Sequence, residues 1–99
     1  MRESEALRAI KEAFRRGRYY IAPHSKKRMS QRAIDLNDIR HAILGAARAE
    51  PYADPRRPLP PGVTSWRVYG VDLEDEELVI GVDLVMDHLG AHATVITVF

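Results

Sequence analysis

One segment of this 99-residue chain combines a histidine with cations at helical spacing. His24, Arg28 and Arg32 are spaced i, i+4 and i+8, so on a helix they would lie along one face. Lys27 and Gln31 flank that face at i+3 and i+7. The segment would therefore present an imidazole, two guanidiniums, an ammonium and an amide close together.

This set of side chains suits RNA cleavage without a metal ion. Such cleavage needs a base that takes the proton of the 2′-hydroxyl and an acid that protonates the 5′-oxygen. It also needs fixed positive charge beside the phosphorane-like transition state, and the planar fork of arginine matches phosphate oxygens. His24 is expected at the helix start, where the helix dipole and the nearby cations favour a neutral imidazole that can accept a proton.

A basic helix face also has a plainer interpretation. Exposed helices carry cations toward solvent, and like charges at i and i+4 cost little there. A histidine at a helix start often makes only local hydrogen bonds. The spacing alone therefore leaves catalysis and a solvated face as alternatives.

The chain as a whole has a net charge of only +1, but that charge is unevenly distributed. Residues 1–40 hold 11 Lys and Arg against 5 Asp and Glu, a net charge of +6, and residues 41–99 hold 4 against 9, a net charge of −5. This asymmetry favours an anionic partner for the first part. The lack of cysteine excludes disulfide scaffolds, thiolate zinc sites and cysteine nucleophiles. No segment has the apolar length of a signal peptide or a membrane helix, so we expect a cytoplasmic protein that does not bind membranes.

Apolar periodicity predicts one α+β domain over residues 1–99, with N-terminal helices packed on a small antiparallel sheet. Three helices are expected, over residues 3–16, 24–33 and 35–45. Ser4 is expected to cap the first helix, and Asp35 with Asp38 to form a capping box on the third. Met29 and Ala33 of the second helix are expected to face the sheet.

Strand periodicity dominates the rest of the chain. Strands are predicted over residues 19–21, 48–52, 65–73, 78–86 and 92–99. Five of the six prolines fall within residues 51–62, which therefore form an extended, stiff loop. Residues 87–90 are expected to form a hairpin turn.

The basic segment and the later strands together resemble a known bacterial family. The matching stretch runs from His24 through Arg28-Met29 and Arg32 to Ile34, and is followed by Asp38-Ile39. Val68-Tyr-Gly70 and the final Ile96–Phe99 strand complete the pattern. Over about residues 20–99 the sequence resembles the family called domain of unknown function 4258. The proline-rich segment and the first helix lie outside that pattern.

The resemblance implies the RelE/barnase-type toxin fold over residues 19–99, with residues 1–17 as an added helix. Many members of the family are described as toxins of type II toxin–antitoxin pairs that cleave RNA without a metal ion. By position, His24, Arg28 and Arg32 would be the catalytic residues, and Thr97 would contribute. The partners would be RNA, free or on the ribosome, and a cognate antitoxin protein. No cofactor and no metal are expected.

Four further residues are candidates for binding the RNA. Lys27 and Gln31 extend the basic helix face, while Arg67 and Tyr69 share one face of their strand by parity. Arg67 and Tyr69 would line an RNA groove because aromatic rings stack on bases. The alternative is an ordinary cross-strand pair. Trp66, on the other strand face, is expected in the core.

The remaining histidines and loop arginines allow several interpretations. His92 and Thr97 fall on opposite strand faces unless a bulge intervenes, so both cannot serve one site. His88 and His92 straddle a turn, and we do not expect them to bind a metal. Arg56-Arg57 would contact either phosphate or an antitoxin. A non-catalytic module that binds RNA or an acidic protein through the basic face is the alternative to an enzyme.

Overall fold

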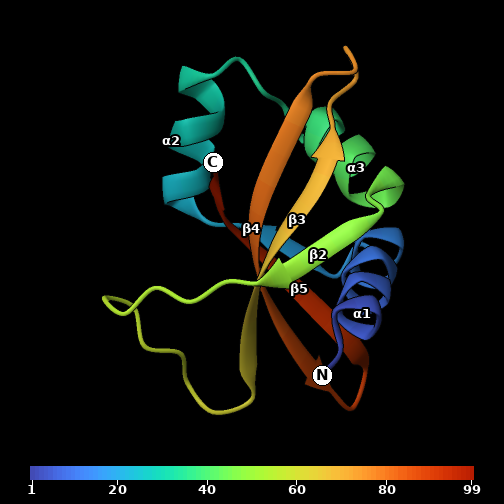
Figure 1. The fold of residues 1–99 in the computed structure, drawn as a ribbon, viewed down its shortest axis with the longest axis vertical. Helices are drawn as coiled ribbons and strands as arrows, with labels where there is room; N and C mark the ends of the chain where they lie inside the picture. The colour runs from blue at the N-terminus through green and yellow to red at the C-terminus, as the bar shows by residue number, and fades with distance from the viewer.

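A five-stranded mixed sheet forms the centre of the α+β fold, which the computed structural model describes over residues 1–99 (Figure 1). The strands are β1 (Tyr19–Ile21), β2 (Arg48–Pro51), β3 (Val63–Val71), β4 (Glu77–Asp87) and β5 (Gly90–Val98). Their order across the sheet is β1-β5-β4-β3-β2. β2 to β5 form an antiparallel meander.

The expectation of a wholly antiparallel sheet is wrong at one edge, because β1 pairs with β5 in parallel. Tyr19 lies opposite Ala93, and Ile21 lies opposite Val95. Antiparallel neighbours are typically joined by short hairpins, whereas parallel strands need long connections. Most of the chain separates β1 from β5, so this pairing is free to be parallel.

Two helices cover one face of the sheet and a third stands apart from them. α1 (Glu3–Arg15) and α3 (Leu36–Gly45) lie on one side of the sheet, and α2 (Pro23–Gln31) lies on the other side in Figure 1. None of these helices has both the length and the apolar character needed to cross a membrane.

The core lies between the sheet and the pair α1 and α3. The predicted stripe of α1 is confirmed, since Ile10 and Phe14 are fully buried there. Ile39 and Ile43 of α3 join them, and Trp66 of β3 is buried as expected. Phe14 also stacks on Tyr19 of β1, with the ring centroids 4.5 Å apart.

The capping box predicted for α3 is confirmed. Asp35 accepts from the Asp38 amide at 3.0 Å, and Asp38 accepts from the Asp35 amide at 3.1 Å. Asp38 also accepts from the Leu73 amide, which ties α3 to the turn between β3 and β4. The Leu73 and Asp35 N–H groups hold the pKa of Asp38 below its ordinary value.

The ends of the other two helices differ from expectation. α1 has Arg2 at its N-cap without a side-chain cap, so Ser4 lies inside the first turn and does not cap it. α2 ends at Gln31, because Ala33 turns left-handed at φ 54° after the Arg32 amide has made the last helical hydrogen bond, to the Arg28 carbonyl. Ala33 is therefore exposed instead of facing the sheet, whereas Met29 is buried as expected.

A bulge in β5 changes which of its side chains share a face. Thr97 pairs with Gly81 and Val95 pairs with Val82, so Ile96 is the extra residue. Further along, His92 pairs with Val85. Directly paired residues share a face, so His92 and Thr97 lie on the same face. The sequence predicted opposite faces for His92 and Thr97 unless a bulge intervenes, and the bulge at Ile96 does intervene.

Gly70 sets how closely α3 approaches β3. A Cβ atom at this position would overlap the backbone carbonyl of Ala42. That carbonyl belongs to a buried helix turn and cannot rotate away. The packing of α3 on the sheet therefore requires glycine at position 70.

We predict that Gly70→Ala lowers the free energy of unfolding by about 1–3 kcal/mol, because α3 must shift to admit the methyl group. Gly45→Ala is the matched control, since a Cβ there meets nothing within 4 Å. Urea denaturation measures both variants. Equal stability of the two variants would contradict the close approach of α3.

Candidate functional site

The face of the sheet turned away from α1 and α3 carries polar side chains. Arg67 and Tyr69 of β3 lie on it, as their parity predicts, while Trp66 and Val68 enter the core. Asp83 and Thr97 follow on the neighbouring strands by register. We call this surface the open face.

A cavity of about 420 Å³ lies between α2, the end of β5 and the proline-rich loop. Its lining residues come from all three segments: His24, Tyr52, Asp54, Arg56, Arg57, Ile96, Thr97 and Phe99. Two of the predicted catalytic residues, His24 and Thr97, thus face one space. The loop arginines belong to the same cavity, although the sequence left their role open.

His24 reaches the cavity because α2 is fixed to β5. Pro23 starts the helix at a position that suits proline, and His24 follows in the first turn. The Ala22 amide donates to the Val95 carbonyl at 2.9 Å, and the buried Ser25 hydroxyl donates to the same carbonyl at 3.0 Å. These two bonds place His24, which lies between their donors in the chain, beside the end of β5.

Arg28 and Arg32 contact the end of the chain instead of lining the cavity. Arg28 donates through Nη2 to the Val98 carbonyl at 3.4 Å, and Arg32 donates to the main-chain oxygen of Phe99. Arg32 is also the C-cap of α2, one residue beyond the helix. The two guanidiniums therefore tie α2 to the final residues of β5.

Lys27 and Gln31 are exposed on α2. Neither residue lines the cavity. They extend the basic surface beside it, and their binding of RNA stays a prediction.

Arg67 lies among aromatic rings at the edge of the cavity. Its guanidinium is 4.9 Å from the ring centroid of Tyr52 and 4.8 Å from that of Phe99. The two rings contact each other edge to face at 5.2 Å. Arg67 also approaches Glu50, its cross-strand partner, at 3.8 Å. Arg67 thus contacts two of the aromatic residues that line the cavity.

Tyr69 belongs to a cross-strand cluster that shares Glu50 with Arg67. Its hydroxyl donates to Glu50, and the Arg48 guanidinium lies 3.8 Å from its ring centroid. The hydrogen bond to Glu50 raises the pKa of the Tyr69 phenol. These contacts fit the cross-strand interpretation, and they place Tyr69 outside the cavity.

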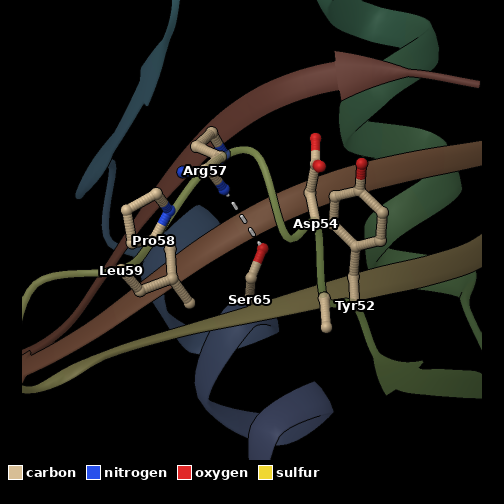
Figure 2. Close-up of a pocket in the computed structure, with 7 residues that line it drawn as sticks. Tyr52, Asp54, Arg57, Pro58, Leu59 and Ser65 are labelled. Carbon is tan, nitrogen blue, oxygen red and sulfur yellow. Dashed lines mark hydrogen bonds between the residues drawn. The ribbon is translucent and has the colours of Figure 1, made fainter.

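The proline-rich loop is anchored to the open face by Arg57. Its guanidinium donates to both carboxylate oxygens of Asp83, at 3.0 and 2.7 Å, and to the Ser65 hydroxyl at 3.4 Å. Figure 2 shows the bond to Ser65 beside a second, smaller cavity of about 250 Å³ under the loop. Hydrogen bonding to Asp83 raises the pKa of Arg57. The anchor holds the loop as one wall of the larger cavity.

Asp54 orients the residue before this anchor. It accepts from the Arg56 amide at 3.0 Å and from the Arg56 Nε at 3.3 Å. These two bonds hold the pKa of Asp54 below its ordinary value, so Asp54 is a carboxylate at neutral pH. Asp54 is not among the residues predicted from the sequence, although Asp-Pro-Arg inside a proline-rich segment is a turn pattern that would have indicated it.

Gly81 of β4 leaves space for three side chains that line the cavity. A Cβ at this position would lie 2.8 Å from the Thr97 methyl and 3.3 Å from both the Ile96 side chain and the Phe99 ring. All three side chains line the cavity. The missing side chain of Gly81 therefore lets the end of β5 fold closely over the open face.

The structure contains no group of three or more His, Cys, Asp or Glu side chains arranged to hold a metal ion. His88 is exposed in the turn after β4, and His92 is half-buried on β5. Neither histidine lines the cavity.

Comparison with family models, curated proteins and solved structures found no match to this chain. The resemblance to the domain of unknown function 4258 family therefore rests on the residues from His24 to Ile34 and on the strand pattern.

We predict that Asp83→Asn frees the proline-rich loop, because it removes the charge that pairs with Arg57. Trypsin cleavage after Arg56 reports the change, since Pro58 protects the bond after Arg57. The variant should be cut several-fold faster than the wild type.

Asp87→Asn is the matched control, because it breaks the similar pair of Arg18 and Asp87 away from the loop. It should leave the loop as resistant as in the wild type. Equal cleavage of the wild type and Asp83→Asn would show that the ion pair does not anchor the loop.

Proposed function

We propose that the protein is an RNA endonuclease that cleaves without a metal ion, and that it acts as the toxin of a type II toxin–antitoxin pair. The observation that carries this proposal is the shared cavity of His24, Thr97 and the loop arginines on the open face. The cavity brings a proton acceptor and cations together. Cleavage through the 2′-hydroxyl needs a group that accepts the hydroxyl proton and positive charge that stabilises the transition state.

In the proposed reaction, His24 takes the proton of the 2′-hydroxyl. The 2′-oxygen then attacks the adjacent phosphorus, and the bond from phosphorus to the 5′-oxygen breaks. The products are a 2′,3′-cyclic phosphate and a 5′-hydroxyl, which receives a proton from an acid. The cations of the cavity stabilise the negative charge that builds up on the phosphoryl oxygens.

Arg28 and Arg32 have a modified role in this proposal. Their hydrogen bonds to Val98 and Phe99 fix the position of α2, and therefore of His24, relative to Thr97. Each guanidinium has five N–H donors and uses one in these contacts. They remain able to attract phosphate while acting as positioning residues.

The toxin assignment rests on the family resemblance together with this cavity. The α+β architecture, with helices beside a small sheet, is compatible with the RelE/barnase-type toxin fold that the resemblance implies. The proposed partners are therefore RNA and an antitoxin protein. Growth arrest on expression, relieved by the product of an adjacent short reading frame, would support this assignment.

We predict that His24→Ala lowers the rate of RNA cleavage by about 10²–10⁴-fold, the usual contribution of a general base. The assay uses purified protein and RNA in EDTA, with the cyclic phosphate end as the measured product. His88→Ala is the matched control, since His88 is exposed and lies outside the cavity.

Three outcomes of this assay are distinct. Loss of cleavage in His24→Ala but not in His88→Ala supports the enzyme. Full activity of His24→Ala overturns the site. Salt-dependent RNA binding without any cleavage by the wild type would favour the alternative, a non-catalytic binding module that uses the same basic surface.

A further inference from the structure

The two arginines of the proline-rich loop have different environments despite being neighbours. Arg57 donates to Asp83 and Ser65, and its side chain is 40% exposed. Arg56 is 91% exposed and contacts only Asp54, through its amide and its Nε. Its two terminal amino groups have no partner within the protein, although Arg56 lines the same cavity as His24.

The other arginines near the cavity each use part of the guanidinium in a protein contact. Arg28 and Arg32 donate to main-chain oxygens of the final residues. The Arg67 guanidinium lies against the Tyr52 and Phe99 rings. Among these cations, Arg56 is the cavity-lining guanidinium with its outer edge free.

Asp54 and Arg57 together orient that free edge. Asp54 accepts a hydrogen bond from the inner Nε of Arg56, which leaves the fork formed by Nη1 and Nη2 without a protein partner. Arg57 fixes the loop to β4 through Asp83. A guanidinium held in this way loses less side-chain freedom when it binds, and its fork matches two phosphate oxygens.

We propose that Arg56 binds a backbone phosphate of RNA in the cavity that contains His24 and Thr97, with Asp54 as its positioning residue. This inference rests on the proposed function for the identity of the polymer. Of the two roles that the sequence left open for Arg56-Arg57, contact with phosphate or with an antitoxin, it assigns the phosphate contact to Arg56. The ligand group is one phosphodiester of a single-stranded RNA.

The test measures the affinity for a 2′-O-methyl RNA oligonucleotide, which cannot be cleaved, over a range of KCl concentrations. Arg56→Ala should make the negative slope of log affinity against log salt less steep by about 0.7, the value for one phosphate on a single strand. Arg56→Lys should keep the wild-type slope, because the charge remains, but bind more weakly because the fork is lost.

Arg2→Ala is the matched control. Arg2 is 87% exposed, contacts one carboxylate, that of Glu5, through its Nε, and lies outside the cavity. Its removal should leave the slope nearly unchanged. A slope for Arg56→Ala equal to that of Arg2→Ala would overturn the inference.

Cleavage of ordinary RNA separates this inference from the proposed function. If the wild type cleaves RNA and Arg56→Ala retains the wild-type salt slope, the endonuclease proposal is supported and the role of Arg56 is overturned. If the wild type binds RNA without cleaving it, and Arg56→Ala shows the predicted change of slope, the role of Arg56 is supported and the endonuclease proposal is overturned. Absence of RNA binding by the wild type overturns both.

Discussion

The bulge in β5 is the constraint on which the arrangement of the cavity depends. By adding Ile96 to the strand, it brings Thr97 onto the open face opposite Gly81. Because Gly81 has no side chain, Thr97 and Phe99 lie closely over β4. Arg28 and Arg32 then bind the main chain of the residues that follow the bulge. A regular strand would turn Thr97 toward the core and leave α2 without this attachment.

Ion pairs on the open face join residues within the acidic second part of the chain, residues 41–99. Two acidic residues of the second part, Glu50 and Asp83, pair there with Arg67 and Arg57. These carboxylates compensate arginines that build the cavity wall. Of the arginines that line the cavity, Arg56 is the one with a free outer edge.

Much of the fold could be predicted because local signals agree with the tertiary structure. The α1 stripe, the α3 capping box and the parity of β3 all follow from residues close in sequence. The parallel pairing of β1 and the bulge could not be predicted, because both depend on contacts between distant segments. Periodicity does not mark one extra residue in a strand rich in β-branched side chains.

The candidate site was only partly accessible from sequence for the same reason. α2 includes His24 and Arg28 and ends at Gln31, one residue before Arg32. The helical spacing does not reveal that Arg28 and Arg32 bind the main-chain oxygens of Val98 and Phe99. The role of the loop arginines depends on Asp54 and Asp83, one local and one 26 residues away from Arg57. The distant partner, Asp83, makes Arg57 the residue that anchors the loop.

The claim that RNA binds in the cavity beside His24 is tested most directly by NMR of the four histidine imidazoles. The protein is titrated with a 2′-O-methyl RNA that cannot be cleaved. We expect the His24 resonances to shift with saturation, while those of His41 and His88, which lie outside the cavity, stay in place. Shifts at His41 or His88 with none at His24 would contradict the location of the site.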